Sequence, residues 1–86
     1  MHAVARFTRT EEKSVYVELD GSRIRNMRGS RAFTGEAFAR RAGVSPKTLR
    51  RVERNRGPVT VSTARKIGAA LGVEDPRSLG RVAGRA

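Results

Sequence analysis

Apolar side chains in residues 36–54 recur at helical spacing, in two groups that Gly43 separates. Because a period of three or four residues places side chains on one face of a helix, the pattern predicts two short helices that pack against a common core. Ser45 is a good N-cap and Pro46 suits the first helical position, which predicts a second helix over residues 46–54. The apolar positions are Phe38, Ala39, Ala42, Val44, Leu49 and Val52.

Capping residues and glycines predict where the other helices begin and end. Each predicted helix follows a Ser, Thr or Asp, and Asp20-Gly21 predicts a turn before the first of them. The residues after Val82 are expected to fray. The predicted helices are 23–31 after Ser22, 35–42 after Thr34, 46–54 after Ser45, 61–71 between Thr60 and Gly72, and a short fifth helix, 76–81, after Asp75.

The chain before the first helix has the composition of β-structure. Residues 14–19 are β-branched and aromatic, which predicts a strand, and residues 3–8 alternate weakly. The two segments form either a β-hairpin or a single strand preceded by a loose arm. The Val15 and Val17 side of the strand would dock on the helices, or the strand would pair with a second chain.

Charge is distributed unevenly along the 86 residues, whose net charge is +11. Residues 23–66 hold thirteen Lys and Arg against Glu36 and Glu53, so this segment alone accounts for a charge of +11. We expect the excess to lie on the helices that contact a polyanion. A merely solubilising surface would spread the charge, and an anionic membrane surface would require a longer amphipathic helix with Trp, which the chain lacks.

Several function classes are disfavoured by composition. The chain has no cysteine, so it has neither disulfides nor Cys-based zinc sites. No apolar run is long enough to cross a membrane, and the start shows no signal pattern, so we expect a cytoplasmic protein. The single histidine is His2, and the acidic residues show no metal-ligand or acid–base pattern. We therefore expect no enzyme, no metal and no cofactor.

Residues from about Ile24 to Leu79 resemble the helix-turn-helix of the XRE family, the phage-repressor and Cro type. The resemblance lies in Ala-Gly-Val-Ser-Pro-x-Thr-Leu-x-Arg-Val-Glu from Ala42, followed by Ala-Arg-Lys-Ile-x-x-Ala-Leu-Gly-Val from Ala64. It implies a mainly α, five-helix, lambda-repressor-like domain with a short N-terminal strand or hairpin. The chain would divide into an arm over residues 1–21, the DNA-binding domain over 22–82 and a frayed tail over 83–86.

The resemblance also implies roles for individual residues. An arginine of the first helix pairs with a glutamate of the recognition helix in related repressors, and Arg28 and Glu53 occupy those places. Pro46 and Gly35 depart from relatives that carry polar side chains there. The base-reading candidates are Lys47, Thr48 and Arg51. The phosphate-binding candidates are Thr34, Gly35, Ser45, Arg50, Arg54, Asn55 and Arg56.

The function implied is sequence-specific binding of double-stranded DNA by a small transcriptional regulator, a repressor, with helix 46–54 in the major groove. Such a protein would act as a homodimer, joined either around Leu79 and Val82 or through the N-terminal strand. The alternative is an antitoxin that binds its operator and contacts a toxin through that strand. RNA binding is disfavoured because exposed aromatic side chains are too few.

Overall fold

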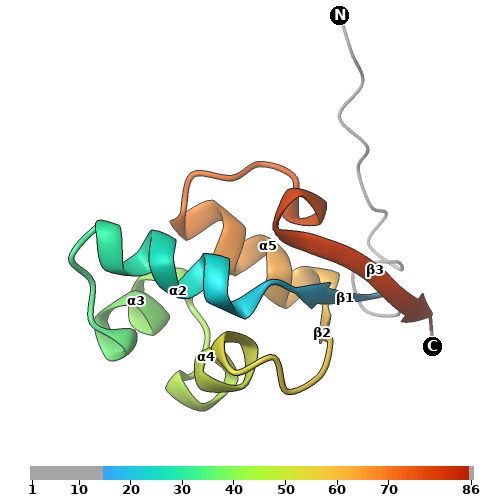
Figure 1. Cartoon of the computed structure of the whole chain (residues 1–86), viewed down its shortest axis with the longest axis horizontal. Coiled ribbons are helices and arrows are strands. Elements are labelled where there is room, and N and C mark those ends of the chain that lie inside the picture. The colour runs from blue at the N-terminus through green and yellow to red at the C-terminus, as the bar shows by residue number, and fades with distance from the viewer. Residues whose placement is uncertain (1–14, 86) are drawn as a thin grey trace, which may run out of the picture.

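The computed structural model describes residues 15–85 and shows helices grouped beside a small sheet (Figure 1). No helix within that range is long and apolar enough to cross a membrane. In order, the elements are β1 (Val15–Leu19), α2 (Gly21–Ser30), α3 (Gly35–Ala42), α4 (Pro46–Glu53), β2 (Val59–Thr60), α5 (Val61–Ala70), the 3-10 helix η1 (Pro76–Leu79) and β3 (Gly80–Arg85).

The sheet has β1 at its centre, between β2 and β3, with both pairings antiparallel. The strand predicted at residues 14–19 is therefore confirmed as β1, and its hairpin partner, residues 3–8, lies outside the described residues. The expectation that the chain frays after Val82 is wrong for residues 83–85. These residues belong to β3, because β1 supplies hydrogen-bonding partners along its length, from Val15 opposite Arg85 to Leu19 opposite Gly80.

One core joins the strands to the helices. Val15, Val17 and Leu19 of β1 are buried in the same cluster as Ile24 and Phe38 from the helices. The alternative in which β1 docks on the helices is thus the correct one, and a strand of the same chain pairs with each edge of β1, β2 at Tyr16 and Val17 and β3 along its length. The other members of the cluster are Ala39, Ala42, Leu49, Val52, Val59, Val61, Ala64, Ile67, Leu71 and Leu79.

The predicted N-caps of three helices are confirmed. The side-chain oxygens of Thr34, Ser45 and Thr60 each accept a hydrogen bond from the backbone N–H three residues later, which satisfies one of the unpaired donors of the first turn. The helix predicted to run to Arg54 ends at Glu53, with Arg54 as its C-cap. The predicted fifth helix is instead a single 3-10 turn, because the chain becomes extended at Gly80 and pairs with β1.

The first helix starts earlier than the sequence suggests. Asp20 is its N-cap, not Ser22, and accepts a hydrogen bond from the Arg23 N–H at 3.1 Å. Gly21 is the first helical residue and not part of a turn. A Cβ atom at residue 21 would lie 2.2 Å from the Val52 carbonyl oxygen, so the absence of a side chain lets α2 begin directly against the end of α4.

Candidate nucleic-acid interface

Helices α3 and α4 form a helix-turn-helix whose outer surface is positively charged. Gly43 adopts a left-handed conformation with φ of 77°, and the Val44 N–H donates to the Ala39 carbonyl at 3.0 Å, which ends α3 and turns the chain. Figure 1 shows α3 and α4 next to each other, on the side of the molecule away from β3. The exposed side chains of α4 are Pro46, Lys47, Arg50 and Arg51, followed at its C-cap by Arg54.

The three base-reading candidates lie in the first two turns of α4. Lys47 is exposed, and its side chain makes no hydrogen bond or ion pair with another described residue. Arg51 is also exposed, and its Nη2 donates to the Arg56 carbonyl at 3.4 Å. Thr48 is half-buried, with its hydroxyl 2.9 Å from the hydroxyl of Ser45. Lys47 and Arg51 are therefore both exposed, with Arg51 bonded to the loop after α4, whereas Thr48 is partly held by the cap.

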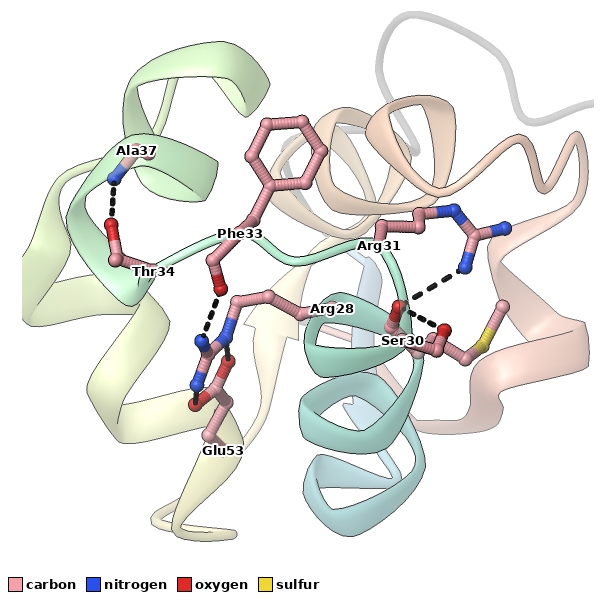
Figure 2. A network of polar contacts seen from close by, with 8 residues as sticks. Arg28, Ser30, Arg31, Phe33, Thr34, Ala37 and Glu53 are labelled. Carbon is pink, nitrogen blue, oxygen red and sulfur yellow. Dashed lines mark hydrogen bonds and ion pairs between the residues drawn. The ribbon is translucent and has the colours of Figure 1, made fainter.

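A hollow of about 350 Å³ brings together the start of α3 and the start of α4. Thr34, Gly35 and Arg50, three of the phosphate-binding candidates, line it together with Glu36 and Pro46. The Thr34 hydroxyl accepts from the Ala37 N–H at 3.2 Å (Figure 2). A helix N-terminus carries partial positive charge and unpaired N–H groups, which suit an anionic oxygen, whereas the exposed Glu36 carboxylate in the same lining opposes one.

Two other phosphate-binding candidates also have structural contacts, which the sequence indicated for Ser45 and not for Asn55. Ser45 is the N-cap of α4, and its Oγ accepts from the Thr48 N–H at 3.0 Å. Asn55 has a left-handed backbone with φ of 54°, and its Oδ1 accepts from the Gly21 N–H at 2.9 Å. Asn55 thus ties the loop after α4 to the start of α2, while the neighbouring Arg56 side chain is exposed.

Arg28 and Glu53 form the ion pair expected between α2 and α4. The Arg28 Nε and Nη2 donate to the two carboxylate oxygens of Glu53 at 2.7 and 2.9 Å, and Nη1 donates to the Phe33 carbonyl at 2.8 Å (Figure 2). The two side chains are 16% and 11% exposed. Hydrogen bonding to Glu53 raises the pKa of Arg28 above its ordinary value. The pair neutralises the acidic residue nearest the charged surface of α4.

Arg25 is a candidate that the sequence reasoning missed. A second hollow, of about 160 Å³, is lined by Arg25, Arg28, Arg50, Glu53 and Arg54. Because Glu53 is already paired with Arg28, the remaining cations around this hollow are Arg25, Arg50 and Arg54. Their side chains make no hydrogen bond or ion pair with other described residues. The spacing of Arg25 and Arg28, three residues apart on one helix, was the available signal.

Not every cation of residues 23–66 lies on this surface, which corrects the expectation from charge distribution. The Arg23 Nη1 donates to the Ser78 carbonyl at 3.0 Å, and the Arg31 Nη2 donates to the Leu71 carbonyl at 3.0 Å. These two arginines tie α2 to the C-terminal part of the fold. The cations exposed around α4 remain numerous, but the full charge of the segment does not face one partner.

Residues 21–79 match the family described as a helix-turn-helix domain, and the chain belongs to this family. The resemblance to XRE-type regulators is thereby confirmed. Comparison with curated proteins gives no match.

Similar solved structures include the restriction-modification controller protein C.AhdI from Aeromonas hydrophila, with 29% identity, 69% of this chain and 88% of that chain covered, and a TM-score of 0.62. The DNA-binding domain of the biofilm regulator SinR from Bacillus subtilis shows 27% identity over 71% of this chain and 88% of its own, also with a TM-score of 0.62. A structure of SinR in complex with DNA shows 28% identity over 69% and 94%, with a TM-score of 0.62.

Proposed function

We propose that this chain binds double-stranded DNA sequence-specifically as a small transcriptional regulator, with α4 in the major groove and repression as the outcome. The observation that carries the proposal is the exposed row of cations on α4, next to the N-terminus of α3. An α-helix with its side chains is roughly 10–12 Å wide, and the major groove is about 12 Å wide, so a helix held in this way fits the groove. The likeness to SinR, a protein solved in complex with DNA, supports the same function.

The roles divide by position on the surface. We assign Lys47, Thr48 and Arg51 to base edges, because they lie in the first two turns of α4, where Lys47 and Arg51 are exposed and Thr48 is half-buried. The start of α3, with Thr34 and Gly35, would receive one phosphate through its backbone N–H groups. The exposed Arg50, Arg54 and Arg56 would contact phosphates on either side, and Ser45 and Asn55 would support them through their structural contacts.

Two copies are expected to bind two half-sites about one helical turn apart. The dimer surface cannot be centred on Leu79, which is 1% exposed, whereas Val82 is 44% exposed. Nor does β1 present an edge, because it lies between β2 and β3. The antitoxin alternative used this strand as the toxin contact and therefore has no support from the described residues. A regulator of this kind would act in the cytoplasm without catalysis or a cofactor.

The test measures binding of the purified chain to duplex DNA by fluorescence anisotropy over a range of salt concentrations. If each of two chains neutralises about five phosphates, the slope of log affinity against log salt should be roughly −9. Absence of binding at low salt, or a slope near zero, would overturn the proposal.

A pair of substitutions tests the division of roles. Arg51→Ala should relax the preference among DNA sequences, whereas Arg56→Ala should weaken binding to all sequences alike. Equal effects of the two substitutions would contradict this division of roles, while DNA binding itself would still stand.

A further inference from the structure

We infer that α4 recognises guanine, and that each half-site contains two guanines one or two base-pair steps apart. The inference deepens the proposed function and rests on it, because it names the chemistry of the DNA that the same surface selects. The exposed side chains of α4 and its C-cap are one proline, Pro46, and four cations, Lys47, Arg50, Arg51 and Arg54. Lys and Arg carry hydrogen-bond donors and no acceptor, and the proline side chain carries neither.

The side-chain acceptors nearest this row are already engaged. Both carboxylate oxygens of Glu53 accept from Arg28. The Ser45 hydroxyl oxygen accepts from the Thr48 N–H, and the two hydroxyls contact each other at 2.9 Å. The Asn55 Oδ1 accepts from the Gly21 N–H. The fully exposed polar side chains of α4 and its C-cap therefore present donors only, and Thr48, which is half-buried, carries the remaining hydroxyl.

A surface made of donors favours guanine over adenine and cytosine, and thymine offers it one acceptor, O4, where guanine offers two. In the major groove, guanine offers two adjacent acceptors, O6 and N7, whereas adenine places an N6 amino donor beside its N7 acceptor, and cytosine offers an N4 amino donor. Two N–H donors of one Lys or Arg side chain can satisfy both guanine acceptors. Against adenine or cytosine, a donor of the side chain would face the amino donor of the base. Side chains that read adenine are Asn and Gln, and those that read cytosine are Asp and Glu. Asn55 and Glu53 are the members of these types within residues 45–56, and each of their side-chain oxygens already accepts a hydrogen bond within the fold.

The spacing of the two exposed base-reading cations sets the separation of the guanines. Lys47 and Arg51 are four residues apart and share one face of α4. Four residues rise about 6 Å along a helix axis, and successive base pairs are about 3.4 Å apart. The two side chains thus reach bases one or two steps apart. The hydrogen bond from Arg51 Nη2 to the Arg56 carbonyl holds this guanidinium toward the C-terminal end of α4, away from Lys47.

Glu36 carries an acceptor near this surface that could also contact a base. It lies in the first turn of α3, is exposed, and lines the same hollow as Pro46. A carboxylate there could accept from a cytosine N4 amino group, which would add a cytosine preference. Its position beside the N-terminus of α3 places it where a phosphate would approach, so we assign it no base, and the substitution Glu36→Gln is included in the test.

The first experiment selects bound duplexes from a random pool with the full chain. The expected result is a half-site with two guanines at adjacent positions or separated by one base pair. The guanines are then replaced singly by 7-deazaguanine, which lacks the N7 acceptor, and affinity is measured by anisotropy. Each replacement should weaken binding by about tenfold, within the range of roughly five- to a hundredfold for a specific base contact. The same replacement outside the half-sites should have no effect.

Variants then link each guanine to its side chain. In the Arg51→Ala variant, replacing one of the two guanines by 7-deazaguanine should no longer lower the affinity. In the Lys47→Ala variant, the same should hold for the other guanine. Arg54→Ala is the matched control, because it removes an equal charge from the same helix end; it should weaken all binding and keep both penalties. Glu36→Gln should leave the selected sequence unchanged.

The inference is overturned if the selected half-sites lack guanine, if 7-deazaguanine is tolerated at every position, or if Glu36→Gln changes the selected bases. In each of these cases duplex DNA is still bound and the proposed function stands. If the chain binds no duplex even at low salt, the proposed function fails first, and the inference fails with it.

Discussion

The Arg28 guanidinium binds both carboxylate oxygens of Glu53, at 2.7 and 2.9 Å, and donates to the Phe33 carbonyl at 2.8 Å. One side chain of α2 thereby contacts the end of α4 and the loop that leads into α3. We expect this junction to help fix the angle between α2 and α4. The same contact removes a negative charge from the surface that would approach DNA.

Glu53→Ala should destabilise the fold by about 2–3 kcal/mol, because it leaves a mostly buried guanidinium without its partner. For a domain of this size the melting temperature should fall by roughly 10 °C or more. Thermal unfolding followed by circular dichroism measures the change.

Glu18→Ala serves as the control for this prediction. Glu18 also pairs with an arginine, Arg81, but at 3.3 Å and with side chains that are 48% and 79% exposed. An exposed pair contributes roughly 0–1 kcal/mol, so this variant should unfold close to the native temperature. Similar losses in the two variants would contradict the role of burial in the Arg28–Glu53 pair.

Two glycines of α2 should respond oppositely to replacement by alanine. At Gly21 the added Cβ would lie 2.2 Å from the Val52 carbonyl oxygen and 2.7 Å from that of Glu53, and backbone cannot yield as a flexible side chain can. Gly21→Ala should therefore lower the free energy of unfolding by an amount typical of overpacking, about 1–3 kcal/mol or more.

Gly29 lies near the other end of the same helix, and a Cβ there would meet nothing within 4 Å. Gly29→Ala should raise stability by about 0.5–1 kcal/mol, because alanine loses less backbone entropy in a helix. Urea unfolding of both variants gives the free energies directly. A Gly21→Ala variant as stable as the native chain would contradict the close contact of α2 with α4, and a destabilised Gly29→Ala variant would contradict the open space around Gly29.

Acid should weaken the junction between α5 and β3 through Asp75. Hydrogen bonds from Arg77 lower the pKa of this carboxyl below its ordinary value, with smaller contributions from the charges of Arg77 and Arg65. A group whose pKa is lower in the folded state stabilises the fold above its unfolded pKa, about 3.9, and this contribution is lost as pH falls through the folded pKa. Asp75→Asn should melt below the native chain at pH 7, and the two melting curves should converge below about pH 4. A gap that persists in acid would mean that the Asp75 charge is not what stabilises this turn.

Local signals were sufficient to predict most helices. Thr34, Ser45 and Thr60 were identified as N-caps because the chemistry of a cap involves residues three positions apart. The strand β3 was missed because its partner is distant: Glu18 lies opposite Arg81 in the register, and the segment itself, with Gly80 and Gly84, has little strand character. The start of α2 was misplaced for a similar reason, since the need for glycine at residue 21 comes from α4.

The residues of the candidate site that lie on one face of α4 could be predicted from the sequence. The contacts that join separate elements could not. Lys47 and Arg51 could be assigned to the outer face of α4 from spacing alone, and Arg28 and Glu53 from the family resemblance. The contact of Asn55 with Gly21 depends on how the loop after α4 approaches α2. That approach is a property of the packed structure and leaves no pattern in neighbouring residues.

Arg25→Gln should weaken binding to every duplex and reduce the salt dependence. Arg25 lines the smaller hollow with Arg50 and Arg54, and no described residue neutralises it. If it contacts one phosphate in each copy of a dimer, its loss should make the slope of log affinity against log salt less steep by roughly 2, without changing the order in which sequences are preferred. Arg81→Gln removes the same charge from β3, where Arg81 pairs with Glu18, and should leave the slope unchanged. Equal slopes for native protein and Arg25→Gln would place α2 outside the DNA contact. An altered sequence preference would instead mean that Arg25 reaches a base edge.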